Sequence, residues 1–240
     1  LIKVFKKSKE LNALLMVHAE SNAIAELNIE KYETICDLSW SQFANAKPIL
    51  CEAEALGRAI YFSKYVGNAL LAVHTTNGEA LSIAEKAQNE GYPIYIETCP
   101  HYLTLFKDLY KDIENGYLAI CSPPLRTHEE GENLWRGIQK GIISVTGSDD
   151  CSYSKKEKSM FLDKDKNGNI IPDFRKVVNG LSGIEIRLPI LLSEGVSKGR
   201  ISINKVCEIA STNIAKLIGC YPKKILHVSD VQLRYVDSMF

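Results

Sequence analysis

The sequence lacks the features that mark several large classes of protein. Its 240 residues include 29 basic and 29 acidic side chains, so the formal net charge is +0. That balance argues against nucleic acid or another polyanion as a partner. No apolar run approaches the roughly 18 residues of a membrane span, and no signal peptide is visible. We therefore expect a cytoplasmic protein that binds neither a membrane nor nucleic acid.

Paired cysteines are also absent. The seven cysteines are an odd number and stand singly, as at Cys36, Cys99, Cys121 and Cys151, with no Cys-x-x-Cys pair. Scattered free thiols suit a reducing compartment better than a disulfide framework. The chain begins at Leu1 rather than Met, and we expect a processed, engineered or truncated product.

The sequence does contain an alternation of apolar strand-like runs and helix-patterned segments, with 45% hydrophobic residues to build a core. This rhythm predicts a parallel sheet covered by helices. A closed (β/α)8 barrel needs eight strands and about 250 residues, so four strands indicate an α/β fold that is the second half of a TIM barrel. The predicted strands are 13–18, 69–74, 93–98 and 142–147, with a short extended run at 118–121. The predicted helices are 2–11, 20–30, 52–66, 79–90, 130–140, 184–194, 203–210 and 212–218, with mixed or irregular segments at 32–47 and 151–182.

Three residues of metal-ligand type follow these strands. His18, His74 and Asp149 each come at or just after the end of an apolar run. Carboxyl ends of barrel strands open onto one face, and that face carries the chemistry of such folds. Two imidazoles and a carboxylate there would suit a divalent metal ion with a bound water. Taken alone, a single His at a strand end is more often a hydrogen-bonded structural residue.

Two charged segments invite a functional interpretation that we do not favour. Residues 163–170 match the first eight positions of an EF-hand calcium loop, but Phe174 stands where a bidentate Glu belongs. A solvated insertion is the simpler interpretation. The stretch from Lys155 to Lys158 is likewise interpreted as a solvated loop.

A series of ordered motifs resembles the hydantoinase/dihydropyrimidinase family of cyclic amidohydrolases, within the metal-dependent amidohydrolase superfamily. The resemblance covers roughly residues 1–224. The motifs lie at 17–21, 73–76, 97–103, 121–126, 134–137, 147–149, 179–187, 199–202 and 221–224.

The resemblance implies a binuclear zinc site in a TIM barrel, with other divalent metals as alternatives. In this family a His-x-His pair, an Asp, two later His residues, a carboxylated Lys and a bridging hydroxide hold the two ions. Carried over by motif, His18 and His74 match the later His ligands, and Asp149 matches the Asp ligand and general base. Ser122 and Asn179 match contacts to the cyclic amide ring of a small-molecule substrate. The family also implies a homotetramer and a place in pyrimidine degradation.

The departures from the family pattern are specific. The five histidines are all isolated, so the chain contains no His-x-His. No segment before His18 would hold the lysine-bearing strand, and Asp150 stands where the family has His. We expect residues 1–220 to be the C-terminal part of the barrel domain. Residues 221–240 would be an atypical tail in place of the usual return into a β-sandwich.

The resemblance therefore implies a hydrolase that opens a hydantoin or dihydropyrimidine ring to an N-carbamoyl amino acid with a metal-activated hydroxide. Allantoinase and dihydroorotase, which share the metal core, are the enzymatic alternatives. A non-catalytic dihydropyrimidinase-like assembly protein is the alternative from another class. With its ligand set incomplete, the chain by itself is expected to bind zinc weakly and to have no useful activity.

Overall fold

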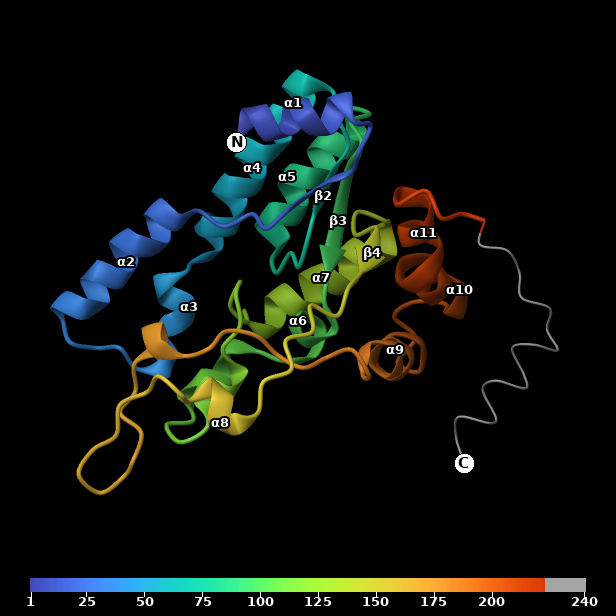
Figure 1. The fold of residues 1–240 in the computed structure, drawn as a ribbon. Helices are drawn as coiled ribbons and strands as arrows, with labels where there is room; N and C mark the ends of the chain where they lie inside the picture. Colours follow the sequence, from blue (N-terminus) through green and yellow to red (C-terminus); the bar gives the residue numbers. More distant parts are fainter. Residues whose placement is uncertain (223–240) are drawn as a thin grey trace.

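The computed structural model describes residues 1–222. Its centre is a four-stranded sheet in the order β1-β2-β3-β4, and all neighbouring strands are parallel (Figure 1). The strands are β1 (Leu15–Val17), β2 (Leu70–Ala72), β3 (Ile94–Thr98) and β4 (Val145–Thr146). Helical segments join each strand to the next. This arrangement is a partial (β/α)8 barrel, as the sequence predicted.

The helices follow the same order along the chain. Those before β4 are α1 (Ile2–Glu10), α2 (Asn22–Thr34), α3 (Phe43–Ala46), α4 (Ile49–Val66), α5 (Gly78–Asn89), α6 (Pro100–Thr104) and α7 (His128–Lys140). Those after β4 are α8 (Lys155–Lys158), α9 (Arg187–Ile190), α10 (Ile203–Cys207) and α11 (Asn213–Leu217). Short π-helical segments continue α9 through Leu191–Val196 and join α10 to α11 through Glu208–Thr212.

Burial explains why the strands form where they do. All three residues of β2 are buried, because the strand pairs on both edges and is covered on both faces. Strand β3 alternates instead, and Ile94, Ile96 and Thr98 point into the core. A continuous apolar run is typical of an inner parallel strand.

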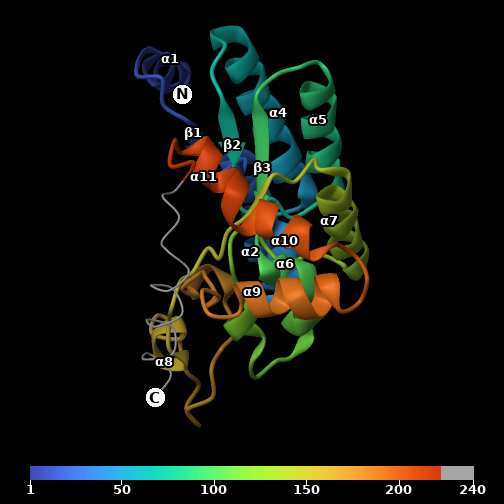
Figure 2. The same ribbon diagram turned by 90° about the vertical axis from the view of Figure 1, so that its right-hand side faces the viewer.

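Three helices cover one side of the strands. Figure 2 shows α4, α5 and α7 side by side, and α5 packs against α4, α7 and β3. The side chains of Asn77 and Thr127 accept backbone N–H bonds at the starts of α5 and α7. Gly67 and Gly141 end α4 and α7 in the left-handed conformation that glycine favours. Local sequence signals therefore set the helix ends, and packing on the sheet stabilises the helices between them.

Two segments differ from the prediction. Residues 118–121 form no strand, because the chain there turns through a 3₁₀ helix at Gly116–Ala119 with Tyr117 buried. Residues 32–47, predicted as mixed and loop-like, hold the end of α2, a 3₁₀ turn at Trp40–Gln42 and helix α3. Trp40 and Phe43 are buried there, so tertiary packing outweighs the weak local pattern.

The irregular segment 151–182 exposes residues 163–169, as predicted for a solvated insertion. The charged stretch from Lys155 to Lys158 differs from the predicted solvated loop, because it forms the short helix α8 and Lys158 at its end is only 4% exposed. Lys164 and Ile170 pair in an antiparallel bridge around a turn, where the Asp165 carboxylate accepts N–H bonds from Asn167 and Asn169. Of the predicted tail at 221–240, residues 223–240 lie outside the described part of the chain.

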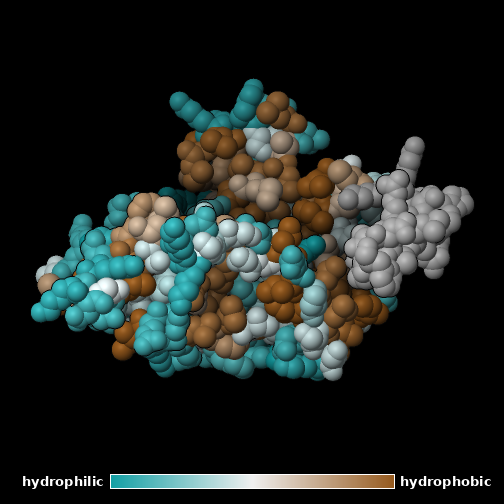
Figure 3. Space-filling model, turned by 60° about the horizontal axis from the view of Figure 1, so that its bottom comes forward, coloured by the Kyte–Doolittle hydropathy of each residue, from teal (hydrophilic) through white to brown (hydrophobic). Residues whose placement is uncertain are grey.

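Hydrophobic side chains also reach the surface. Figure 3 shows them gathered over the upper and central part of one face, beside a mainly hydrophilic region on the left. Exposed large apolar side chains on the N-terminal elements α1, β1 and α2 include Val4, Met16 and Leu27. Within residues 1–222, no helix combines the length and the apolar character needed to cross a lipid bilayer.

Candidate active site

Two histidines meet at the carboxyl ends of the first two strands. His18 follows β1 directly, and His74 stands two residues beyond β2. His18 Nδ1 lies 2.9 Å from His74 Nε2, and the ring centroids are 4.7 Å apart. Burial lowers the pKa of the His74 imidazole, and the neighbouring His18 lowers it further. These effects favour the neutral form of His74, and a nitrogen of each ring points toward the other.

Asp149 comes from the end of the fourth strand. It follows β4 by three residues, and its charge acts on both His74 and the nearby Glu97. Asp149 and His74 both have positive φ angles, of 46° and 42°. Such backbone strain in non-glycine residues concentrates at functional sites.

The histidine pair fits a shared divalent ion only in part. Two nitrogens bound to one tetrahedral zinc ion at about 2.0–2.1 Å lie about 3.3 Å apart, close to the observed 2.9 Å. Among residues 1–222, however, no three His, Cys, Asp or Glu side chains form a group that would hold a metal ion. The structure thus joins two of the predicted ligands and does not gather Asp149 with them.

The two predicted substrate residues also lie together. The Ser122 hydroxyl donates to Asn179 Oδ1 across 3.2 Å, although the two residues are 57 positions apart in the chain. Asn179 Nδ2 donates to the Val177 carbonyl, which fixes the amide. Their role toward a substrate stays a prediction.

A continuous polar path joins the histidine pair to Ser122. His18 Nε2 lies 3.5 Å from Glu20 Oε2, and Lys47 Nζ donates to both Glu20 Oε2 at 2.6 Å and Ser122 Oγ at 2.9 Å. Burial raises the pKa of Glu20. The hydrogen bond with His18 and the Lys47 ammonium outweigh that effect and hold the pKa at about 2. Glu20 is therefore an anion that orients His18 on one side and Lys47 on the other.

Sequence reasoning assigned no role to Glu20 or Lys47. Glu20 belongs to the His18 motif, and its position two residues after a candidate ligand could have indicated a role in the site. Lys47 lies in the segment that was predicted as mixed and loop-like, and only the fold shows that its ammonium reaches the site.

Two more titratable groups lie near the pair. Glu97 Oε1 accepts the backbone N–H of His74 at 3.4 Å, and burial raises the pKa of Glu97. His101 is buried against Tyr102, with ring centroids 4.1 Å apart. Burial, and then the neighbouring His74, lower the pKa of His101 to about 4.

Asp150, the departure from the family pattern, has a structural use. Its Oδ1 accepts the backbone N–H groups of Gly183 and Ile184, and its Oδ2 accepts the Ser152 hydroxyl. The side chain thereby holds the loop that follows Asn179.

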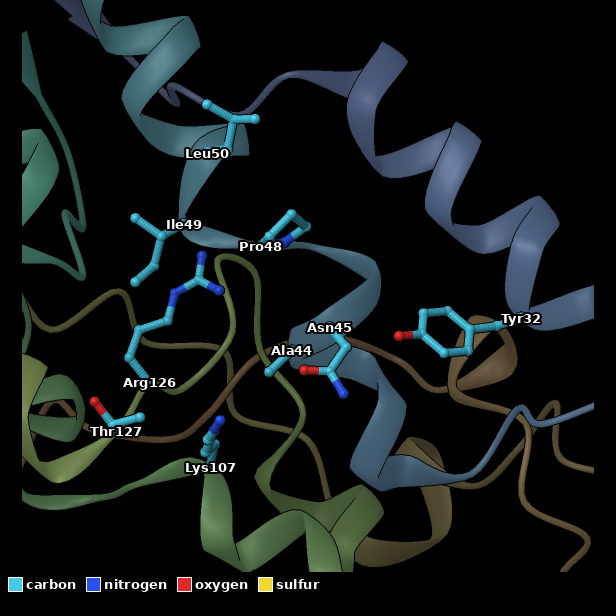
Figure 4. A pocket seen from close by; sticks show the side chains of 9 residues that line it. All are labelled: Tyr32, Ala44, Asn45, Pro48, Ile49, Leu50, Lys107, Arg126 and Thr127. Atoms are coloured by element: carbon cyan, nitrogen blue, oxygen red, sulfur yellow. The ribbon is translucent and has the colours of Figure 1, made fainter.

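A cavity of about 460 Å³ lies beside the segment that carries Lys47. Figure 4 shows its lining, which comes from α2, α3, the start of α4 and the loop that carries Arg126. None of the five predicted site residues lines it. Arg126 is already occupied there, since its guanidinium donates to Thr76, to Glu52 and to the Lys47 carbonyl. This cavity therefore does not replace the strand-end site as the candidate.

The fold and the site define a class of protein, namely α/β barrels with polar side chains at the carboxyl ends of parallel strands. No family model matches the chain. Among curated proteins, D-phenylhydantoinase of Escherichia coli O1:K1 is 36% identical over 224 residues, 93% of this chain and 47% of the relative. D-hydantoinase of Geobacillus stearothermophilus is 38% identical over 218 residues, 90% of this chain and 45% of the relative.

Solved structures agree with these relatives. A D-hydantoinase crystal structure matches with a TM-score of 0.86 and 37% identity, covering 93% of this chain and 47% of its own. Dihydropyrimidinase from Brevibacillus agri NCHU1002 matches with a TM-score of 0.86 and 34% identity, covering 92% of this chain and 46% of its own. L-hydantoinase from Arthrobacter aurescens, at 28% identity and a TM-score of 0.83, covers 93% and 47%.

The chain is similar to hydantoinases and a dihydropyrimidinase along 90–93% of its own length, the resemblance that the motifs predicted. It spans about half the length of the curated relatives that it matches.

Proposed function

We propose that this chain is the substrate-facing part of a metal-dependent cyclic amidohydrolase that opens a hydantoin or dihydropyrimidine ring to an N-carbamoyl amino acid. The main support is the polar path that joins the facing His18 and His74 to Ser122 and Asn179. Ligands for an ion and groups for a ring thereby lie in one connected site. A cytoplasmic location, a tetrameric assembly and a role in pyrimidine degradation belong to the same proposal.

Each residue has a separate part in the proposed reaction. His18 and His74 would hold an ion such as Zn²⁺, which would supply Lewis-acid polarisation and lower the pKa of a water molecule. Asp149 accepts the proton of the attacking water and returns it to the leaving ring nitrogen, as general base and then general acid. Ser122 and Asn179 hold the ring in position. Glu20 fixes the orientation of His18, which a protein carboxylate commonly does for a histidine ligand.

Two other functions are weighed against this one. Allantoinase or dihydroorotase would use the same ligands and differ in the ring they accept. A non-catalytic assembly protein has no need of a strained Asp149 or of two imidazoles with their nitrogens 2.9 Å apart, so those features favour the enzyme.

The test is a ring-opening assay on hydantoin, 5,6-dihydrouracil, allantoin and dihydroorotate with added Zn²⁺, Mn²⁺ or Co²⁺. We expect the 240-residue chain alone to show no useful rate, because it has no His-x-His. A rate is expected when the N-terminal half of Geobacillus stearothermophilus D-hydantoinase is added. Asp149→Asn, with the fold retained, should lower that rate by about 10²–10⁴-fold, as loss of a general base does. A complemented rate that Asp149→Asn leaves unchanged would reject the role of Asp149.

A further inference from the structure

Lys158 is a buried cation at a junction of two loops. Its Nζ donates to the Ile120 carbonyl at 2.8 Å and to the Gly180 carbonyl at 2.7 Å. No carboxylate within residues 1–222 lies within ion-pair distance of Lys158. A buried ammonium is costly without an anionic partner, and burial lowers the pKa of Lys158 to about 8. The two main-chain carbonyls are what hold this side chain in place.

Both carbonyls adjoin the residues proposed to face the ring. Ile120 stands two residues before Ser122, and Gly180 directly follows Asn179. The Gly180 N–H also donates to the Ile120 carbonyl at 3.1 Å, so the two loops are joined directly as well. Lys158 therefore bridges the loops at the place where Ser122 and Asn179 come within 3.2 Å of each other.

The backbone at Gly180 is closely packed against its surroundings. Gly180 has a φ of 132°, and a Cβ at that position would overlap the Cβ of Cys151. Helix α8 is itself fixed by a capping box between Ser154 and Glu157. The backbone of α8, which carries Lys158, and the loop at Gly180 are therefore both fixed in position.

We infer that Lys158 is a positioning residue that sets the spacing of the Ser122 and Asn179 loops for ring binding. It touches no reacting atom and acts through the backbone of both loops. The inference rests on the proposed function where it assigns ring contacts to those two residues. Charge-assisted hydrogen bonds are stronger than neutral ones, so their loss should loosen both loops together.

The experiment measures amide hydrogen exchange by mass spectrometry on the full 240-residue chain. Lys158→Met is compared with the wild type and with Lys156→Met, a matched change at an exposed lysine of the same short helix. We expect Lys158→Met to speed exchange at least about tenfold in peptides covering 118–123 and 177–183 while the strands stay protected. Lys156→Met should leave both peptides unchanged. Lys158→Arg, which keeps a cation and several N–H donors, should retain part of the protection.

Two exchange results would overturn the inference. One is unchanged exchange in both peptides, and the other is a uniform rise over the sheet and the loops alike, which indicates general destabilisation. If Lys158→Met does not fold, Lys158→Gln replaces it in the experiment. Glutamine keeps two N–H donors on a side chain too short to reach both carbonyls, and the same two exchange results would overturn the inference.

Ring binding separates this inference from the proposed function. Calorimetry with 5,6-dihydrouracil is expected to show at least about tenfold weaker binding to Lys158→Met, since small misplacements of binding groups are costly. Equal affinity in a wild type that binds would overturn the inference. Absence of binding to the wild type would count against the proposed function alone, and the exchange result would then decide the role of Lys158.

Discussion

Asp149 has a backbone conformation that few residue types tolerate. Its φ of 46° places it in the left-handed region, where Asp and Asn are enriched and most other non-glycine residues are strained. Asp149 lies three residues beyond β4, and its charge acts on the buried His74. The unusual backbone conformation thus occurs at a residue of the proposed active site.

This strain predicts a difference between two substitutions. Asp149→Asn keeps a side chain that suits the left-handed region and should change the free energy of unfolding by less than about 0.5 kcal/mol. Asp149→Ala should cost about 1 kcal/mol, because alanine adopts this conformation poorly. Urea unfolding of both variants measures the difference. Equal stability of the two would show that the conformation at Asp149 relaxes easily.

His101 predicts a dependence of stability on pH. Its pKa is about 4 in the fold and 6.5 in an unperturbed imidazole. Between these values the unfolded chain binds the proton and the folded chain does not, so stability falls as the pH drops from about 6.5 to 4. At about 1.36 kcal/mol per pKa unit, the loss from this residue is up to about 3 kcal/mol.

Substitution of His101 isolates this contribution. His101→Gln should flatten the fall in unfolding free energy between pH 6.5 and 4.5, measured by urea titration at several pH values. His128→Gln, a matched change at an exposed histidine, should leave the fall as it is. Identical pH profiles for His101→Gln and the wild type would contradict the assignment.

The sequence predicted the site residues that belong to motifs. It did not predict the residues that position them. His18, His74, Ser122 and Asn179 were found by motif, and the fold brings them together in two pairs. Glu20, Lys47 and Lys158 act through contacts between residues 22 to 75 positions apart. No spacing rule along the chain reports such contacts. Lys158 was even interpreted as solvated, because the charged residues around it are.

Among the elements, two glycines in helix interiors have opposite surroundings. Gly57 in α4 has open space where a Cβ would lie. A Cβ on Gly137 in α7 would stand 2.7 Å from Leu81 Cδ1 and 3.1 Å from Ile143 Cδ1, both side chains being buried. Gly137 therefore lets α7 pack closely on α5 and on the approach to β4.

Alanine at the two positions should change stability in opposite directions. Gly57→Ala should stabilise the chain by about 0.5–1 kcal/mol through helix propensity. At Gly137 the same gain is outweighed by overpacking of about 1–3 kcal/mol, and the net effect should be a loss. Thermal and urea unfolding of the Gly57→Ala and Gly137→Ala variants would measure both changes in stability. A gain at both positions would mean that the α5–α7 interface yields freely.

Prediction of the elements succeeded where periodicity was strong and failed where tertiary packing decides. The four strands and the helices that become α4, α5 and α7 follow clear apolar patterns. Residues 118–121 are apolar and short, and such a run does not distinguish a strand from a buried turn. The π-helical segments at Leu191–Val196 and Glu208–Thr212 interrupt helices predicted as regular, because the i→i+5 pattern has no sequence signature.

At the scale of the whole molecule, the last strand contributes little to the exposed apolar surface. Ile142, Ile143 and Val145, in and just before β4, are all buried. Strand β4 is in contact with the segment between α10 and α11, which covers it. Exposed apolar side chains occur in several parts of residues 1–222. On the N-terminal elements, Met16 on β1 is 54% and Leu27 on α2 is 69% exposed.

The edge of the sheet lies in the same region. Within residues 1–222, β1 pairs only with β2, so its outer edge has no strand beside it. An unpaired edge next to exposed apolar side chains favours association with other chains. The N-terminal elements, rather than the last strand, are thus the expected contact surface.

We therefore predict that the chain self-associates through β1 and α2. Size-exclusion chromatography with light scattering should show an apparent mass that rises with protein concentration. The double variant Met16→Glu with Leu27→Glu should shift the profile toward monomer, because it removes apolar surface and adds like charges that repel. Ile113→Glu, at a still more exposed apolar residue outside these elements, is the control and should not shift it. A wild-type monomer at every concentration would show that a sheet edge and an apolar surface of this size are tolerated in solution. A shift by Ile113→Glu as large as that of the double variant would place the contact elsewhere.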